Sequence, residues 1–382
     1  LAASGQPVRL KTYQFTRRRE GVIIPIRMYM RAIMNQQTVR DLAQVVQRNC
    51  HISDARHGAD YSLCVYLMKM REYYRWEKRL PYGANLGKDE VGDWLQEREQ
   101  LWEQLLEADL EPIEIAGESF DPFDAEGINE RLEPYGLVYS SGLGNQAKPH
   151  FFLGDLESHN QNGDYSVFVA AAEYARDLTA PPAMTLGRSV FLRRESLRRM
   201  LWEKLESWRW SRPDNALGRA FACYDFEDAL DESLDAMTDR EIDAVLLHEE
   251  GEYEAGLRLG EEWNAMLLEL AHTPAELMAR AVRDHLADCL TTLPALAETG
   301  DAPSLHFYVG NLSNMRNEIF PGLRRAYSEW SETLDSEPLA AIAELGRSHW
   351  ERLAHDMMNL YRGTEDIPVA EQIQELVKQR YL

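Results

Sequence analysis

The chain has 382 residues, of which 45% are hydrophobic and 27% are charged, and its net charge at pH 7 is −23. This composition is typical of an ordinary soluble globular protein. No apolar run approaches the roughly 20 residues that a membrane-spanning helix needs. The four cysteines are too few for a disulfide scaffold in a chain this long. We therefore expect a cytoplasmic protein with reduced cysteines and no membrane span.

The negative charge is distributed unevenly along the chain. Residues 1–50 hold nine Arg and Lys against two acids, so this basic arm carries about +7 and the remainder about −30. A basic arm is a candidate for binding nucleic acid, but the acidic body would repel phosphate. We expect the arm instead to contact acidic surface of its own or a sister chain, which would make the protein a homo-oligomer.

Helical periodicity dominates the first hundred residues. Apolar spacing predicts a helix over residues 28–49, and a second helix is expected to begin at Ser53 or Asp54, since both residue types are good N-caps. This second helix would run toward Arg79, before Pro81 and Gly83. A third helix is predicted over residues 88–108.

Turn-forming residues then become frequent, and short β-prone runs lie between them. The runs "YGLVYS", "HFFLGDL" and "YSVFVAA" predict strands, and the Asn-Gly pair in "NQNGD" predicts a hairpin between the last two. We expect a small antiparallel β insertion near residues 135–172. The segment "TAPPAMTLG" is interpreted as a linker.

The second half of the chain is predicted to be helical throughout. Pro and Gly breaks separate expected helices at 239–250, 252–271, 274–296, 315–334, 337–361 and 367–380. The predicted fold class is therefore mainly α, with a helical N-terminal part, the small β insertion and a helical-bundle C-terminal half. The expected domains are 1–134 with the basic arm, 135–186 with the β insertion, and 187–382 with the bundle.

The stretch "NCHISDARHGADYSLC", residues 49–64, concentrates polar side chains. If Asp54 caps a helix and His57 makes one hydrogen bond, the stretch has only a structural role. The alternative is a polar pocket at a helix N-terminus, where amide donors favour an anion and arginines such as Arg56 assist. The candidate residues of this polar cluster are His51, Asp54, Arg56 and His57.

Carboxylate–imidazole pairs at helical spacing are the main chemical signal. Spacings of three and four residues place both side chains on one helix face. Such pairs are Asp54 with His57, His248 with Glu252, His285 with Asp288, and Glu351 with His355. In an acidic protein, ion pairing or solvation accounts for most pairs of this kind.

The pairs at 248–252 and 285–288 stand out, because each lies in a largely apolar helix. A buried carboxylate must be paired or bound to a cation. Gly251, Gly256 and Gly260 follow His248 at a spacing suited to close helix approach. The predicted metal ligands are His248, Glu249 or Glu252, His285 and Asp288. Mixed carboxylate and imidazole ligation favours Fe or Mn over Zn.

This spacing resembles that of helical metal oxidases of the heme-oxygenase-like type. The resemblance concerns the type of site and covers no contiguous motif. The functional hypothesis is a metal-dependent oxidoreductase with a carboxylate–histidine site in the C-terminal bundle. The alternative is a non-catalytic assembly protein with an acidic surface and a basic N-terminal arm.

Overall fold

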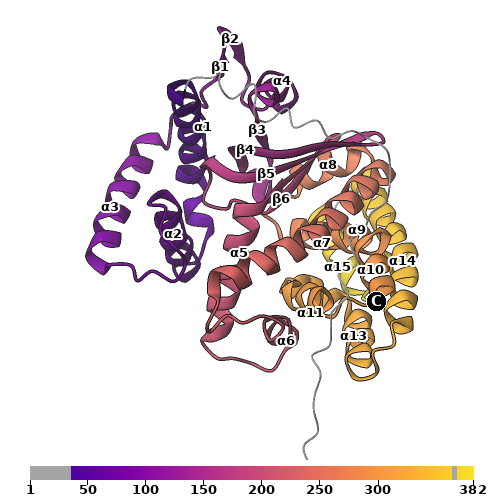
Figure 1. The fold of residues 1–382 in the computed structure, drawn as a ribbon. Helices are drawn as coiled ribbons and strands as arrows, with labels where there is room; N and C mark the ends of the chain where they lie inside the picture. The colour runs from indigo at the N-terminus through magenta and orange to yellow at the C-terminus, as the bar shows by residue number, and fades with distance from the viewer. Residues whose placement is uncertain (1–35, 364–367) are drawn as a thin grey trace, which may run out of the picture.

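The computed structural model describes residues 36–363 and 368–382. The chain forms an α/β part, up to residue 193, which packs against a helical part that starts at residue 194 (Figure 1). Most of the basic arm, residues 1–35, lies outside the described residues, and so does the start of the helix expected at 28–49.

Four α-helices belong to the described residues of the α/β part. They are α1 (Gln36–His57), α2 (Leu63–Glu77), α3 (Lys88–Leu105) and α4 (Ala125–Leu132). The third expected helix, 88–108, is confirmed to within three residues. The second is shorter than expected, because α1 continues through Asp54 to His57 and α2 begins only after Ser62.

Seven strands form two sheets in the part of the chain that the structure describes. A two-stranded ribbon consists of β1 (Ile113–Ile115) and β2 (Glu118–Phe120), and a five-stranded sheet has the order β3-β4-β5-β7-β6. Its strands are β3 (Leu137–Leu143), β4 (Pro149–Asn162), β5 (Tyr165–Arg176), β6 (Ala183–Leu186) and β7 (Ser189–Arg193). The Asn-Gly hairpin is confirmed, with Asn162 paired to Tyr165 and Gly163 at φ +64°.

The predicted fold class, mainly α with a small antiparallel β insertion near 135–172, is therefore wrong. The sheet is a substantial part of the fold, it extends to Arg193, and β5 pairs with β7 in parallel. The supposed linker contains β6, and β7 lies within the segment 187–382 expected to be a helical bundle. Strands of four and five residues are too short for periodicity to distinguish them from helix, and their pairing with β5 decides their conformation.

Helix α1 covers one face of this sheet. Its apolar residues Leu42, Val46 and Cys50 pack against Phe151 and Leu153 of β4 in one buried cluster. The Cys50 thiol also donates to the Phe151 carbonyl oxygen at 3.2 Å. These contacts hold the C-terminal turn of α1 beside the start of β4, where several polar residues meet.

The helical part contains eleven described helices. They are α5 (Arg194–Arg209), α6 (Ala216–Phe221), α7 (Leu230–Leu259), α8 (Glu261–Glu269), α9 (Pro274–Leu290), α10 (Thr292–Thr299), α11 (Ala302–Asn311), α12 (Asn314–Ile319), α13 (Pro321–Thr333), α14 (Glu337–Arg362) and α15 (Val369–Lys378). The helices expected at 239–250 and 252–271 differ most, because α7 runs unbroken for 30 residues.

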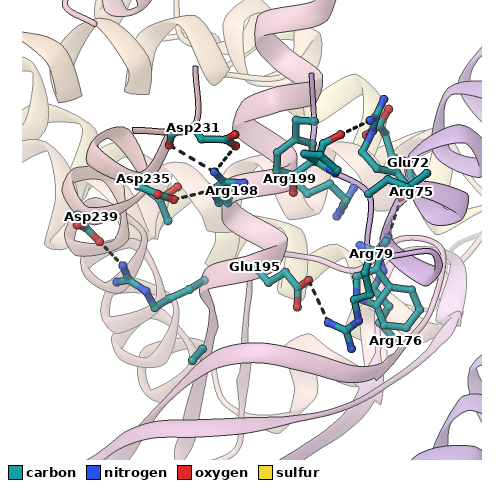
Figure 2. Close-up of a pocket in the computed structure, with 17 residues that line it drawn as sticks. Glu72, Arg75, Arg79, Arg176, Glu195, Arg198, Arg199, Asp231, Asp235 and Asp239 are labelled. Carbon is teal, nitrogen blue, oxygen red and sulfur yellow. Dashed lines mark hydrogen bonds and ion pairs between the residues drawn. The ribbon is translucent and has the colours of Figure 1, made fainter. Parts of the chain in front are cut away.

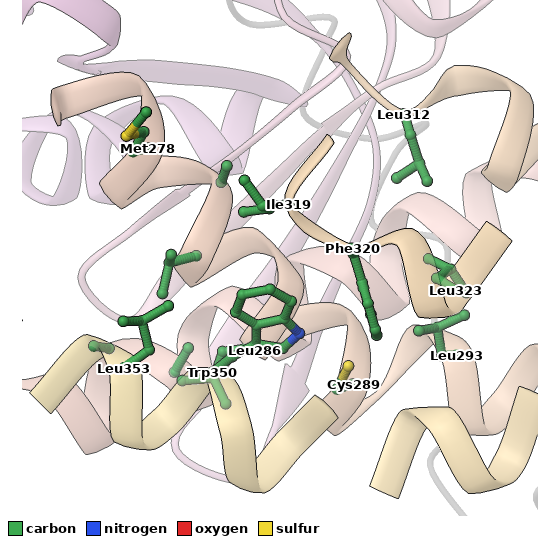
Figure 3. Close-up of a cluster of buried hydrophobic side chains, with 14 of the residues drawn as sticks. Met278, Leu286, Cys289, Leu293, Leu312, Ile319, Phe320, Leu323, Trp350 and Leu353 are labelled. Atoms are coloured by element: carbon green, nitrogen blue, oxygen red, sulfur yellow. The ribbon is translucent and has the colours of Figure 1, made fainter. Parts of the chain in front are cut away.

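Helix α9 lies at the centre of this bundle. It begins where expected, with Thr273 accepting from the Glu276 amide and Pro274 in the first turn. Its residues Leu286 and Cys289 join a large hydrophobic cluster with Phe320 and with Trp350 of α14 (Figure 3). The opposite side of α9 faces α7.

A single glycine allows α7 to approach α9 closely. A Cβ on Gly251 would lie 2.3 Å from the Ala287 carbonyl oxygen and 2.5 Å from the Thr291 hydroxyl. Of the three glycines singled out for helix approach, Gly256 has no neighbouring atom within 4 Å of such a Cβ, and Gly260 ends the helix at φ +73°. Only Gly251 thus has the expected role.

Among the described residues, no helix is long and apolar enough to cross a membrane. All four cysteines, Cys50, Cys64, Cys223 and Cys289, are free thiols.

The contact at Gly251 predicts opposite effects for two glycine substitutions on one helix. Gly251→Ala should destabilise the protein by roughly 1–3 kcal/mol, because the new methyl group forces two backbones apart. Gly256→Ala should leave stability unchanged or raise it by up to about 1 kcal/mol, because alanine favours helix and meets no obstacle. Urea unfolding measures both, and equal effects would contradict the proposed close crossing.

Candidate functional site

The polar stretch at 49–64 ends one helix and does not begin another. Ser53 and Asp54 are buried in the last turns of α1, so the expected N-cap role of either residue is wrong. The Ser53 hydroxyl donates to the Pro149 carbonyl oxygen at 2.5 Å. Ser53 and Asp54 therefore bind partners on β4 and on the loop before it, although local capping preference assigned them to a helix start.

Asp54 belongs to a buried ion pair. The Lys148 ammonium donates to its Oδ1 at 2.8 Å and to the Thr179 hydroxyl at 3.1 Å, and the Leu178 amide donates to its Oδ2 at 2.8 Å. The side chain of Asp54 has no exposed surface and that of Lys148 is 7% exposed. Removing one partner of such a pair leaves a buried charge uncompensated, which is strongly destabilising.

A second buried pair lies next to the first. His150 Nδ1 lies 3.0 Å from Asp177 Oδ2, and the Ala180 amide donates to Asp177 Oδ1. Burial by itself raises the pKa of Asp177, but His150 and Lys148 outweigh it and hold this pKa well below the usual range. Asp177 is therefore a fixed negative charge beside Lys148 and His150.

A polar pocket of about 480 Å³ opens between the α/β part and the helical part. The α/β part contributes Lys148, His150 and the segment from His57 to Tyr61. The helical part contributes Glu249 and Glu252 from α7 and Arg280 and Arg283 from α9. Two polar segments that lie almost 200 residues apart in the sequence therefore line one pocket.

The wall formed by α7 and α9 holds a carboxylate–histidine cluster, which we define as His248, Glu249, Glu252, Asp284 and Asp288. His248 Nδ1 lies 2.7 Å from Asp288 Oδ1, and its Nε2 lies 3.5 Å from Glu252 Oε1. Glu252 and Asp284 share a side-chain hydrogen bond. Ligand atoms of His248, Glu252 and Asp284 all lie within 4.8 Å of one another, so these three residues are suited to hold a metal ion.

Two arginines border the carboxylate–histidine cluster. Arg283 donates to Glu252 Oε1 at 2.6 Å. Arg316, from α12, forms an ion pair with Asp288, which also accepts from the Tyr308 hydroxyl at 2.7 Å. Asp288 is thus fully engaged by protein groups, whereas Glu252 and Asp284 lie nearer the polar pocket with side chains 16% and 23% exposed.

The predicted ligands separate into two groups in space. His248, Glu252 and Asp288 come together as expected, and Glu249 is adjacent but accepts from the Thr185 hydroxyl at 2.6 Å. His285 lies apart from them: its Nε2 donates to the Arg316 carbonyl oxygen at 2.9 Å, and its ring stacks on Trp350 at 5.1 Å between centroids. His285 therefore belongs to the hydrophobic core of the bundle.

The remaining residues of the predicted polar cluster have separate roles. His51 contacts Arg98 and Trp102 of α3. Arg56 donates to the carbonyl oxygens of Leu106 and Ala108 just beyond α3. His57 pairs with Asp60 at 2.9 Å and lines the polar pocket. Of these side chains only His57 reaches the pocket directly, while Asp54 supports it through Lys148.

The sequence did not indicate that several site residues bind one another. Lys148, Asp177, Arg283 and Arg316 lie far in the sequence from the groups they bind, and no spacing rule links them. Asp284 could have been identified from the sequence, because it stands one helix turn before Asp288 and so lies on the same helix face.

Burial and charge set the protonation of the carboxylate–histidine cluster. Burial lowers the pKa of His248, but Asp288 and Glu252 outweigh it and hold this pKa well above its ordinary value. Burial raises the pKa of Glu249 to about 7, and the Glu252 carboxylate adds to this effect. Burial likewise raises the pKa of Asp284, while Arg283 and His248 bring that of Glu252 down to about 2 despite its burial.

Comparison with protein-family models identifies two consecutive domains. Residues 41–193 match the N-terminal domain, and residues 198–380 the C-terminal domain, of a family of unknown function (DUF6866). The two matches together take in most of the chain, which therefore belongs to this family. Searches of curated proteins and of solved structures gave no match. The first match ends with β7 and the second begins in the first turns of α5, so the polar pocket lies between the two domains of the family.

The raised pKa of Glu249 predicts a specific pH dependence of stability. Between pH 4.5 and about 7 the folded state keeps this proton while the unfolded state loses it, so stability falls as pH rises through that window. The loss is complete above about pH 7 and amounts to roughly 3 kcal/mol. Relative to wild type, Glu249→Gln should therefore gain about that much stability over this window.

Urea unfolding at several pH values in the presence of a chelator measures this difference. Glu254→Gln, which removes a half-exposed carboxylate from the same helix, controls for the loss of one negative charge. If the stability difference between Glu249→Gln and wild type stayed constant with pH, Glu249 would not be a proton-holding group of the site.

Proposed function

We propose that the protein is a metal-dependent enzyme, an oxidoreductase, that holds a divalent ion of iron or manganese between His248, Glu252 and Asp284. The observation that carries the proposal is the convergence of one ligand atom from each of these residues within 4.8 Å. Nitrogen and oxygen ligands bind metal ions at about 2.0–2.2 Å. Two ligand atoms of one ion therefore lie at most about twice that distance apart, and the separations within this cluster are close to that limit or below it.

The orientation of the imidazole supports the same role. Asp288 engages His248 Nδ1, which leaves Nε2 directed toward Glu252. Metal-binding histidines usually donate their other ring N–H to a carboxylate, which fixes the ring and raises its basicity. Asp288 is therefore assigned as a positioning residue, held in turn by Arg316 and Tyr308.

Charge balance gives a second line of support. The cluster has four carboxylates, from Glu249, Glu252, Asp284 and Asp288, against the two guanidiniums of Arg283 and Arg316. Two excess negative charges in a largely buried site require two protons or one divalent cation. The two protons would be carried by His248 and by one carboxyl group whose pKa is raised. Metal binding would replace them, so metal affinity should rise with pH.

The donor set points to the class of ion. One imidazole and two carboxylates form a hard, mixed N/O site that suits iron and manganese, and these metals perform redox chemistry. Three protein ligands leave coordination positions open for substrate. Glu252 lines the polar pocket, so substrate in that pocket would reach the ion directly.

Metal binding is predicted to stabilise the folded protein in a ligand-dependent way. After chelation, adding Mn²⁺, or Fe²⁺ without oxygen, should raise the melting temperature. A concentration 100 times the Kd corresponds to roughly 2.7 kcal/mol. His248→Ala and Glu252→Gln should abolish this increase. Thermal unfolding followed by fluorescence measures it for each variant.

His355→Ala is the matched control, because His355 also follows a glutamate at helical spacing but is exposed and bonds the Glu351 carbonyl oxygen. Its response to metal should equal that of wild type. No stabilisation of wild type by either ion would refute the metal site. Equal stabilisation by Mg²⁺ would retain the site but favour a non-redox reaction.

The alternative function, assembly through the basic arm, has one specific observation in its favour. Helix α2 exposes apolar side chains at its start, with Leu63 71%, Met68 48% and Leu67 45% exposed. We propose a second copy of the chain as the partner, since the basic arm of one copy then meets the acidic body of another. The four free cysteines support a reducing, cytoplasmic location for either function.

Deleting residues 1–20 should lower the oligomeric state or the melting temperature at low salt. High salt should have the same effect on the full chain, because the Debye length falls from about 10 Å at 0.1 M to about 3 Å at 1 M. Light scattering after gel filtration, with thermal unfolding alongside, measures both. If the full chain is monomeric and the deletion alters neither quantity, the arm has no role in assembly.

A further inference from the structure

A second pocket is lined by arginines. It encloses about 760 Å³ between α2 and the loop after it, β5, α5 and α7 (Figure 2). We call it the arginine pocket, defined by Arg75, Arg79, Arg176, Arg194, Arg198 and Arg199. None of these residues belongs to the carboxylate–histidine cluster.

On the α7 side of this pocket the arginines are neutralised. Arg198 donates to Asp235 at 2.6 Å and to Asp231 at 2.8 Å, and Arg194 pairs with Asp239 (Figure 2). These acids are spaced four residues apart along α7, so they form one row facing α5. This wall therefore has little net charge to offer a ligand.

On the β5 side Arg176 has no carboxylate at ion-pair distance, although Glu173 and Glu195 lie near enough to favour its charged form. Arg176 is 2% exposed, and among the described residues no carboxylate oxygen lies within 4.0 Å of its guanidinium. Its Nη2 donates only to the Glu72 carbonyl oxygen, at a long 3.4 Å, and its Nε has no hydrogen-bond partner. The guanidinium stacks over Trp76 at 4.7 Å from the ring centroid.

Arg79 adds a second weakly compensated charge. Its Nη1 lies 4.0 Å from Glu195 Oε1, the limit of an ion pair, and its Nη2 donates to the Glu173 carbonyl oxygen at 3.4 Å. Glu173 Oε1 accepts from Arg193 and Ser196, while its buried Oε2 has no hydrogen-bond partner. Figure 2 shows Arg79 and Arg176 on the same side of the pocket.

The position of Arg176 is fixed before any ligand arrives. Gln47 accepts from its backbone amide at 3.1 Å and donates to its carbonyl oxygen at 3.0 Å. Trp76 and Tyr73 hold its guanidinium from one side. An unpaired buried cation costs several kcal/mol of stability, which a bound anion would offset.

We propose that the arginine pocket binds the phosphoryl group of a metabolite-sized phosphate monoester, with Arg176 and Arg79 as its anion ligands. Guanidinium groups match phosphate oxygens with paired N–H donors. The cavity falls in the size range of small-molecule sites and exceeds what inorganic phosphate fills. The carboxylates of Asp231 and Asp235 retain free lone pairs, and they lie where hydroxyl groups of the ligand body would donate.

Inorganic phosphate and ribose 5-phosphate are the probes, measured by calorimetry and by thermal unfolding at constant ionic strength. Wild type should bind both, with the monoester the tighter ligand. Arg79→Gln, at a mostly exposed side chain, should weaken the Kd at least roughly tenfold. Arg188→Gln, at an exposed arginine in the turn between β6 and β7, is the control for loss of one positive charge and should bind as wild type does.

Arg176→Met tests the role of the buried charge separately. It should abolish phosphate binding and leave the melting temperature without phosphate unchanged or higher, because it removes an uncompensated cation while preserving the packing. A lower melting temperature with phosphate binding retained would show that Arg176 is purely structural. Absence of phosphate binding by wild type, or equal weakening by Arg79→Gln and Arg188→Gln, would also overturn the proposal.

Discussion

The close crossing of α7 and α9 at Gly251 is the constraint on which the carboxylate–histidine cluster depends. A side chain at this position would collide with the backbone at Ala287, so only glycine permits the observed approach. His248 and Glu252 lie on either side of Gly251 in sequence, and Asp284 and Asp288 on either side of Ala287. The crossing therefore brings two pairs of polar side chains together from helices whose other faces are apolar. The hydrophobic cluster around Trp350 packs against α9 as well, so both neighbours of this helix contribute to its position.

Charge burial follows two patterns in this molecule. Asp54 with Lys148, and Asp177 with His150, are paired within hydrogen-bond distance and join α1, β4 and the segment after β5. These pairs stabilise one arrangement of the α/β part, because breaking either leaves a charge in a medium that solvates it poorly. The carboxylate–histidine cluster and Arg176 differ: the cluster has more carboxylates than guanidiniums, and the Arg176 guanidinium has no ion-pair partner among the described residues. Such imbalance is more typical of ligand sites than of structural ion pairs.

The two pockets share a boundary formed by α5 and the end of β5. Arg199 lines the arginine pocket and donates to the carbonyl oxygens of Thr179 and Ala180, and Thr179 lines the polar pocket. Glu249 likewise joins α7 to β6 through the Thr185 hydroxyl. A ligand in either pocket would thus contact the joint between the two domains of the family. The polar pocket exists only because these domains pack against each other.

The sequence by itself determined helices α3 and α14, the Asn-Gly hairpin, the start of α9 and the pairing potential of His248 with Glu252, because these depend on local spacing and capping. It also indicated Gly251 as a point of close approach. Only the tertiary structure decided that β6 and β7 are strands, since their partner β5 supplies the hydrogen bonds that such short segments lack on their own. It also placed Asp54 at a helix end, directed His285 into the core and put Asp284 beside Glu252. In each of these cases the deciding partner lies on another element of the fold. For the three helical residues, moreover, a shift of one position along the helix rotates a side chain by about 100° toward or away from that partner.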